Sequence, residues 1–273
     1  MIDAHHHLWR FTEEEFSWID SELIRCDFLA SDLDAVLVEN QVSGAVAVQA
    51  RCSLEENEFL LSQASLSPMI QAVVGWVDLK SAEVGAQLDE CRANPVFKGV
   101  REITQGASDA EFFEHPRFHE GIRELTKRDL SYDVLIFQDQ MKAATRFIDQ
   151  HPEQRFVLDH AGKPVIQSGE FPDGWERNIR EMAQREHLVC KVSGLVTEVR
   201  DETWDDGLMQ RYFDVLLESF GPQRLMFGSD WPVSLTASSY TRWRESVQQY
   251  FSSLTKDEQA AVHTETARTF YQL

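Results

Sequence analysis

The chain has 273 residues, of which 42% are hydrophobic and 26% are charged, and its formal net charge at pH 7 is −20. A chain of this length can bury one large core, and it contains no apolar run long enough to cross a membrane. The acidic balance argues against nucleic acid as a partner, because phosphates need a basic surface, and it also disfavours anionic membranes.

Eight apolar, β-branched segments recur along the chain and are predicted to be strands. In chain order they are residues 1–8, 44–50, 70–78, 97–104, 131–138, 155–161, 188–195 and 224–232. Helical patterns separate them at 31–41, 53–65, 82–93, 116–129, 140–152, 174–186 and 209–222, and two more follow at 239–253 and 255–273. Ser53 and Glu56 have the spacing of a capping box, and Gly221 before Pro222 predicts a helix stop.

Strands that alternate strictly with helices predict a parallel sheet covered by helices. Eight such units in roughly 250 residues are typical of a (β/α)8 TIM barrel of the α/β class. We predict this barrel as a single domain over residues 1–273. A doubly wound open sheet is the competing architecture, but the glycine-rich loop G-x-G-x-x-G that often follows its first strand is absent from this sequence.

The cysteines and the first residues bear on the compartment. Cys26, Cys52, Cys91 and Cys190 are scattered and form no C-x-x-C pair, which favours a reducing compartment. No segment resembling an export signal precedes the first predicted strand, so we expect a cytoplasmic location.

The first predicted strand carries three consecutive histidines. Side chains alternate faces along a strand, so His5 and His7 are expected to point one way and His6 the other. Two imidazoles on one face can bind one metal ion or one substrate oxygen. A His-x-His pair alone is equally compatible with a polar strand end that has no role.

Polar residues also follow the later predicted strands, at the end where a TIM barrel forms its active site. They are Arg101 and Glu102, Gln138, Asp159, His160 and Lys163, Lys191 and Ser193, and Ser229 and Asp230. Singly, each has a simpler explanation: Asp230 could cap a helix, and His160 could be a hydrogen-bonded core histidine. Jointly, three histidines and a carboxylate indicate a water-activating site with the ligand types of a divalent metal.

Five segments carry a resemblance that covers nearly the whole chain: IDAHHHLW, FKGVRE, FVLDHAGKP, CKVSGLVTE and RLMFGSDWPV. They resemble the amidohydrolase superfamily, and within it the branch of TIM-barrel lactonases that open L-fucono- and L-rhamnono-type sugar lactones or pyrone dicarboxylate. The resemblance implies that His5 and His7 form the His-x-His pair of the first strand. It also implies that His160 is the histidine of the DH-x-GKP segment and that Asp230 is the last-strand aspartate that activates water.

The chain departs from the binuclear pattern of that superfamily. Lys98 lies at the start of the fourth strand rather than its tip, Gln138 ends the fifth strand where a histidine would stand, and Glu102 follows GVR where relatives have histidine. We therefore expect at most one divalent ion, with zinc preferred. His5, His7 and Asp230 would bind it and Glu102 would be a fourth ligand; a metal-independent site is the open alternative.

The function predicted from these features is hydrolysis of a lactone, preferably a sugar-derived aldonolactone. In this scheme Asp230 takes a proton from the attacking water, and His160 stabilises the oxyanion or the leaving hydroxyl. The remaining predicted substrate contacts are Arg101 and Lys163 for substrate oxygens and Trp9, Trp231 and Trp76 for the pocket wall.

Two other functions stay open at this point. One is a decarboxylase or C–C hydrolase of the same superfamily that acts on an aromatic carboxylic acid. The other is a non-catalytic small-molecule binding protein, which would have no need of Asp230. A homo-oligomer is also open, whereas nucleic acid and membranes are not expected as partners.

Overall fold

Eight parallel strands form one sheet in the computed structural model, which describes residues 1–167, 171–200 and 203–273. The sheet order is the chain order, and each strand is parallel to its neighbours. The strands are β1 (Ile2–His6), β2 (Gly44–Val48), β3 (Ile70–Gly75), β4 (Phe97–Ile103), β5 (Ser131–Leu135), β6 (Phe156–Leu158), β7 (Leu188–Val192) and β8 (Leu225–Phe227). Each lies inside a predicted strand.

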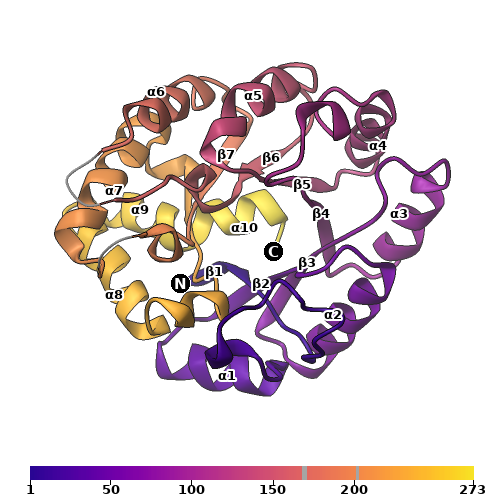
Figure 1. Ribbon diagram of the computed structural model, residues 1–273. Helices are drawn as coiled ribbons and strands as arrows, with labels where there is room; N and C mark the ends of the chain where they lie inside the picture. The colour runs from indigo at the N-terminus through magenta and orange to yellow at the C-terminus, as the bar shows by residue number, and fades with distance from the viewer. Residues whose placement is uncertain (168–170, 201–202) are drawn as a thin grey trace.

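The first and last strands close the sheet into a barrel. His6 and Trp231 form a parallel bridge, the amide of His7 donates to the Trp231 carbonyl at 2.7 Å, and the Asp230 amide donates to the His5 carbonyl at 2.8 Å. Helices surround the closed sheet (Figure 1). The predicted (β/α)8 TIM barrel is therefore confirmed.

Most helices also follow the prediction. They are α1 (Ala30–Glu39), α2 (Leu54–Leu66), α3 (Val84–Arg92), α4 (Pro116–Lys127), α5 (Met141–Asp149), α6 (Asp173–Met182), α7 (Asp206–Phe220), α8 (Tyr240–Phe251), α9 (Lys256–Ala260) and α10 (Thr266–Tyr271). The last predicted helix is divided, because a π-helical turn at Ala261–Glu265 separates α9 from α10. Among the described residues, no helix is both long and apolar enough to span a membrane.

Two of the predicted helix signals have different outcomes. Gly221 ends α7 with a left-handed φ of 66°, as expected of a helix stop. Ser53 caps α2 by accepting from the Glu55 amide, but Glu56 does not complete a capping box. Its carboxylate instead accepts from the Ala50 amide at 2.9 Å and from Arg51 Nε at 2.9 Å.

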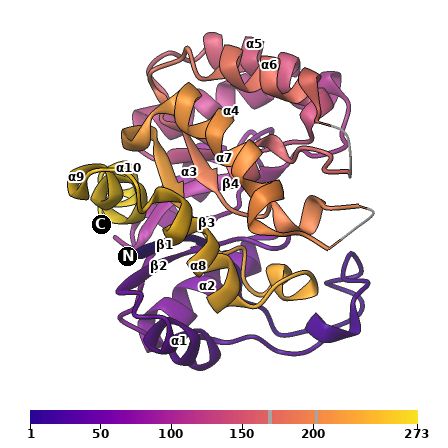
Figure 2. The same ribbon diagram turned by 90° about the vertical axis from the view of Figure 1, so that its left-hand side faces the viewer.

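The amino-terminal end of the barrel is sealed by α10. Ile2, Ala4, Val48 and Met226 form an apolar cluster inside the barrel, and Tyr271 of α10 packs into it. Figure 1 shows α10 lying across the centre of the ring of strands, and Figure 2 shows α9 and α10 beside the chain termini. The carboxyl ends of the strands are thereby left as the end at which a ligand can enter.

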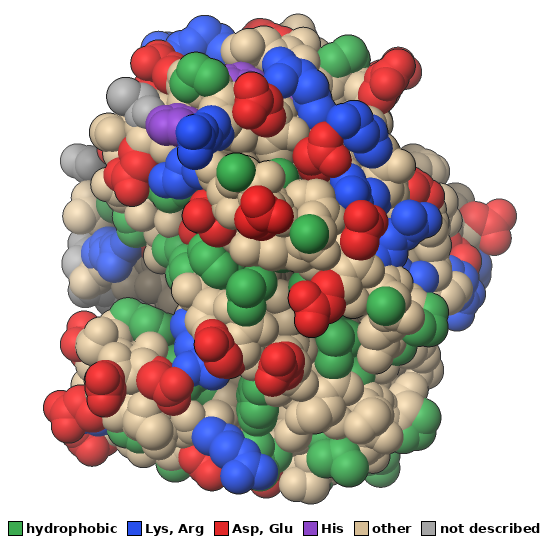
Figure 3. All heavy atoms as spheres, turned by 90° about the vertical axis from the view of Figure 1, so that its right-hand side faces the viewer, with side chains coloured by type: hydrophobic (Ala, Val, Ile, Leu, Met, Phe, Trp, Pro, Cys, Tyr) green, Lys and Arg blue, Asp and Glu red, His purple; other side chains and the backbone are tan. Residues whose placement is uncertain are grey.

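The outer surface carries mixed charges despite the acidic total. Figure 3 shows acidic and basic side chains interspersed over the face formed by α3 and α4. Arg128, at the end of α4, donates to both Asp89 of α3 at 2.8 Å and Glu124 at 2.6 Å. Such exposed pairs contribute little to stability, about 0–1 kcal/mol each, but they join neighbouring helices.

Candidate active site

An irregularity in β1 directs two of the three histidines into the barrel. The register of β1 against β2 shifts between Asp3 and His6. Such a bulge commonly re-aims side chains next to active sites. Beyond Ala4, which packs in the inner apolar cluster, His5 and His7 face each other with their Nε2 atoms 3.2 Å apart. His6 does not join this contact: its ring is buried, and its two nitrogens have no hydrogen-bond partner among the described residues.

Asp230 and His160 join this pair from β8 and β6. Both have left-handed backbones, with φ of 57° and 52°, which turn their side chains over the end of the barrel. Asp230 Oδ1 lies 3.4 Å from His7 Nε2, 3.8 Å from His160 Nε2 and 3.9 Å from His5 Nε2. The structure thus brings together the four residues that are predicted for water activation.

Each imidazole is oriented by the ring nitrogen that faces away from Asp230. His7 Nδ1 donates to the Val48 carbonyl at 2.8 Å, and since a carbonyl only accepts, His7 presents a lone pair on Nε2. His160 Nδ1 lies 2.8 Å from Ser193 Oγ. Gly194 makes room for that ring, because a Cβ atom there would lie 2.4 Å from His160 Nδ1.

The pKa shifts of these four residues favour neutral imidazoles around an ionised Asp230. Burial lowers the pKa of His160 to about 4 and lowers the pKa values of His5 and His7. Burial alone would raise the pKa of Asp230, but His160 and His7 hold it below its ordinary value. At neutral pH the site therefore contains an ionised carboxylate that can accept a proton.

A cavity of about 320 Å³ lies over these side chains. It is lined by His7, His160 and Asp230, by the polar residues Arg101, Gln105, Lys163 and Thr197, and by Trp18, Ala50, Ile103, Leu135 and Val233. This volume suits a small organic molecule. The mixture of polar groups with one large aromatic side chain suits a ligand with many oxygens and one apolar face.

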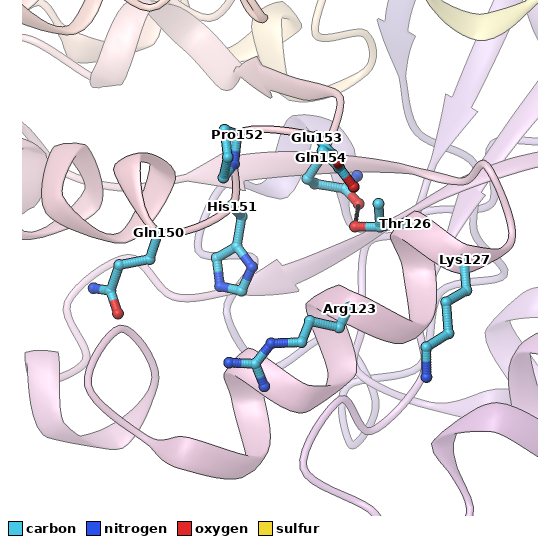
Figure 4. Close-up of a pocket in the computed structure, with 8 residues that line it drawn as sticks. All are labelled: Arg123, Thr126, Lys127, Gln150, His151, Pro152, Glu153 and Gln154. Carbon is cyan, nitrogen blue, oxygen red and sulfur yellow. Dashed lines mark hydrogen bonds between the residues drawn. The ribbon is translucent and has the colours of Figure 1, made fainter.

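Another hollow, of about 410 Å³, lies at the opposite end of the barrel (Figure 4). Arg123 and Lys127 of α4 and His151 and Glu153 line it, just before β5 and β6 begin. It contains none of the predicted site residues. Because TIM-barrel chemistry occurs at the carboxyl ends of the strands, we assign the candidate site to the cavity above Asp230.

The two predicted cationic substrate contacts do line the cavity. Arg101 Nη1 lies 3.3 Å from His5 Nε2 and 3.1 Å from Asp159 Oδ2, which holds the guanidinium at the cavity floor. Lys163 Nζ lies 3.6 Å from Glu198 Oε1 and 5.6 Å from the centre of the Phe137 ring.

The predicted aromatic wall needs correction. Trp9 is fully buried, and its Nε1 donates to the Cys26 carbonyl at 2.9 Å. Trp231 is also buried and packs edge-on against Phe28, with ring centres 5.1 Å apart. Neither lines the cavity, whereas Trp18, which is 45% exposed, does. Trp18 lies in the long loop between β1 and α1 and lines the cavity from there. The only signal for this contact in the sequence is that Trp18 follows the first strand in a segment with no predicted helix or strand.

Glu102 is turned away from the histidines. Side chains alternate along β4, so Arg101 points into the barrel and Glu102 points outward with Val100. Its Oε2 accepts from Trp76 Nε1 at 2.9 Å, and its Oε1 accepts from the Ile103 amide at 3.0 Å. The candidate ligand group of His5, His160 and Asp230 does not include it. The expectation of Glu102 as a fourth ligand, and of Trp76 as a pocket wall, therefore gains no support from the geometry.

The donor set of His5, His7 and Asp230 fits one divalent ion. Tetrahedral zinc with Zn–N bonds of about 2.0–2.1 Å separates neighbouring donor atoms by roughly 3.3 Å. The separations here are 3.2 Å between the two Nε2 atoms, 3.4 Å between His7 Nε2 and Asp230 Oδ1, and 3.9 Å between His5 Nε2 and Asp230 Oδ1, so the last pair would have to close by about 0.6 Å around the ion. His160, whose Nε2 lies 3.8 Å from Asp230 Oδ1, is a further donor that could complete or replace a member of this set. The outward nitrogen of each imidazole also contacts polar groups, as is usual for metal-binding histidines.

Comparisons with known proteins agree with this geometry. The amidohydrolase family matches residues 2–273. The chain is 36% identical to an L-fucono-1,5-lactonase of Burkholderia multivorans, over 100% of this chain and 96% of that protein. It is 33% identical to an L-fucono-1,5-lactonase of Burkholderia ambifaria, over 100% and 95%.

A solved structure shares the whole fold. An amidohydrolase of Burkholderia multivorans with bound Zn superposes with a TM-score of 0.95 at 35% sequence identity, covering 100% of this chain and 99% of that one. The family match spans nearly the full sequence, and the similarity in sequence and in fold extends from end to end. The chain belongs to the amidohydrolase family.

Proposed function

We propose that this protein hydrolyses a sugar-derived lactone of the L-fucono-lactone type. The observation that carries the proposal is an ionised Asp230 ringed by three imidazoles at the floor of a cavity of about 320 Å³. Two full-length relatives named L-fucono-1,5-lactonase support the substrate class. Arg101, Gln105 and Thr197 offer polar contacts to sugar hydroxyls, and Trp18 offers an aromatic face to the ring.

The chemistry follows from the positions of the side chains. Asp230 accepts one proton from a water molecule while the water oxygen bonds to the lactone carbonyl carbon. The guanidinium of Arg101, beside His5 Nε2, faces the same space and can stabilise the negative charge on the carbonyl oxygen. The bond between that carbon and the ring oxygen then breaks. The ring oxygen takes the proton from Asp230, and the product is a hydroxy acid.

A single divalent ion, with zinc favoured by the related structure, would be held by His5, His7 and Asp230. When bound, it would supply Lewis-acid polarisation of the carbonyl and a lower pKa for a bound water. His160 lies outside this ligand set in our proposal and is left to contact the carbonyl oxygen or the leaving oxygen.

A panel of substrates tests the proposal. Purified protein is assayed with sugar lactones and with aromatic carboxylic acids, while acid release is followed with a pH indicator and carbon dioxide is measured separately. We expect acid release from at least one six-carbon deoxysugar lactone and no carbon dioxide. Carbon dioxide from an aromatic acid, without lactone turnover, would favour a decarboxylase. Tight binding without any turnover would favour a binding protein.

A further inference from the structure

A layer of charged side chains fills the barrel directly beneath the candidate site. Lys191, Asp133 and Asp159 are fully buried, and Arg101 is 3% exposed. Lys191 Nζ lies 2.5 Å from Asp133 Oδ2 and 2.9 Å from Asp159 Oδ1, while Arg101 Nη1 donates to Asp159 Oδ2 at 3.1 Å. Two cations and two carboxylates balance one another where most barrels have apolar side chains.

Two residues of this layer, one positively and one negatively charged, lie next to the same ring nitrogen of His5. His5 Nδ1 lies 3.0 Å from Lys191 Nζ and 3.4 Å from Asp159 Oδ1. An ammonium group can only donate a hydrogen bond and an ionised carboxylate can only accept one. Because a neutral imidazole carries one proton, Lys191 suits the tautomer with that proton on Nε2, and Asp159 suits the tautomer with it on Nδ1.

The other nitrogen of His5 is buried beneath the cavity, 3.2 Å from His7 Nε2 and 3.3 Å from Arg101 Nη1, and the two tautomers present different groups to these neighbours. His7 presents a lone pair on Nε2, since its Nδ1 donates to the Val48 carbonyl. In the first tautomer, His5 Nε2–H can donate across the 3.2 Å gap to His7, and Arg101 Nη1, which only donates, must then direct its hydrogens to Asp159 and not to His5. In the second, both Nε2 atoms carry lone pairs; that of His5 can accept from Arg101 Nη1 at 3.3 Å, or the two can bind one cation together.

We propose that Lys191 and Asp159 are positioning residues that favour opposite tautomers of His5. Lys191 stabilises the Nε2–H form, in which His5 is a hydrogen-bond donor in the site without metal. Asp159 stabilises the Nδ1–H form, in which His5 and His7 bind a divalent cation. This inference deepens the proposed function and rests on it for the identity of the site, and it gives one physical basis for both metal-bound and metal-free states.

The two positioning residues should therefore act on metal affinity with opposite signs. A positive charge 3.0 Å from His5 Nδ1 opposes a second cation on the same ring, and it also holds the lone pair that would have to receive the proton. A carboxylate in the same place favours the cation and accepts the proton. Mere damage to the layer would instead weaken metal binding whichever residue was changed.

Zinc affinity, measured by chelator competition on metal-stripped full-length protein, tests this. Asp159→Asn is expected to weaken zinc binding about 10- to 100-fold, the usual effect of losing such a partner. The double variant Lys191→Met/Asp133→Asn removes one charge of each sign, so that no buried charge is left unpaired. It is expected to bind zinc more tightly, by about tenfold, because the cation beside the ligand ring is gone. Asp133→Asn alone is the matched control: because it leaves the Lys191 charge in place and less compensated, it should not tighten zinc binding.

Weaker zinc binding in the double variant, or equal affinities in all of these proteins, would overturn the proposal. A second measurement needs no variant with an altered layer. The ¹⁵N shifts of the His5 ring, assigned by their loss in His5→Gln, should report Nε2–H in the metal-free wild type. A metal-free ring already in the Nδ1–H form would also overturn the proposal. Neither readout needs turnover, so a failed lactone assay would not be confused with either result.

Discussion

At the scale of single residues, the sequence predicts the site residues that directly follow or end a strand. His5, His7, His160 and Asp230 are each predicted for the site, and the structure places the three ring nitrogens within 3.9 Å of Asp230 Oδ1. The predicted aromatic contacts are wrong because they depend on the path of a loop. Trp9 lies too close to β1 to leave the core, whereas Trp18, nine residues further on, reaches the cavity.

Trp18 should contribute to substrate binding more than to the chemical step. If packing a sugar ring on the Trp18 face is worth as much as an aromatic pair, about 0.5–1.5 kcal/mol, the upper end corresponds to roughly a tenfold change in affinity. We expect Trp18→Ala to raise KM about tenfold for the best lactone with little change in kcat, measured by steady-state kinetics. Leu23→Ala, which alters an exposed side chain in the same loop, is the control. An unchanged KM in Trp18→Ala would exclude the contact.

At the scale of elements, the predicted strands are correct but their internal geometry is not visible in the sequence. The shift in β1 depends on how β1 pairs with β2, and pairing joins residues about 40 positions apart. The outward direction of Glu102 depends on the register of β4 in the closed barrel. A charged residue inside an apolar strand, as in LVCKV around Lys191, is the available signal for the buried ionic layer.

Gly194, just after β7, is expected to be required for the position of His160. Its φ is 62°, and a Cβ atom added to it would approach His160 Nδ1 to 2.4 Å, so there is no room for alanine. Gly194→Ala should destabilise the fold by about 1–2 kcal/mol from the backbone alone and should also lower kcat by displacing the imidazole. Gly174→Ala, with open space around the added methyl group, is the control. Equal stability and activity in both variants would contradict this role.

Asp3 of β1 forms hydrogen bonds with residues that follow β8, and its ionisation makes the stability of the fold depend on pH. It accepts from the Ser229 amide at 2.8 Å and from Tyr240 at 3.1 Å, and burial raises its pKa to about 6. A raised carboxyl pKa means that the folded state binds the proton more tightly, so this contribution to stability is present below about pH 4 and is lost as pH rises through 6.

The Asp3→Asn variant isolates that contribution. Between pH 4 and pH 7, the free energy of unfolding of the wild type should fall relative to that of Asp3→Asn by up to about 3 kcal/mol, since one pKa unit is worth about 1.4 kcal/mol. Urea unfolding at each pH measures the difference. A difference between the two proteins that stays constant with pH would show that Asp3 does not titrate in this range.

At the scale of the whole molecule, the alternation of strands and helices is enough to predict the barrel and which end carries the site. It does not predict how the other end is closed. The 255–273 segment is expected to be one helix, but the π-helical turn divides it, and α10 packs Phe270 and Tyr271 against the inner cluster. That packing involves residues from both ends of the chain, which local sequence patterns do not relate.

The most direct test of the account concerns Asp230 as the base that activates water. Asp230→Asn keeps the shape of the side chain but cannot accept a proton at neutral pH, and general-base catalysis contributes about 10²- to 10⁴-fold. Steady-state hydrolysis of the best lactone, with zinc in excess and the zinc content determined for both proteins, should show kcat lower by that factor while unfolding and substrate KM stay close to wild type. An Asp230→Asn variant with near wild-type kcat would contradict the account.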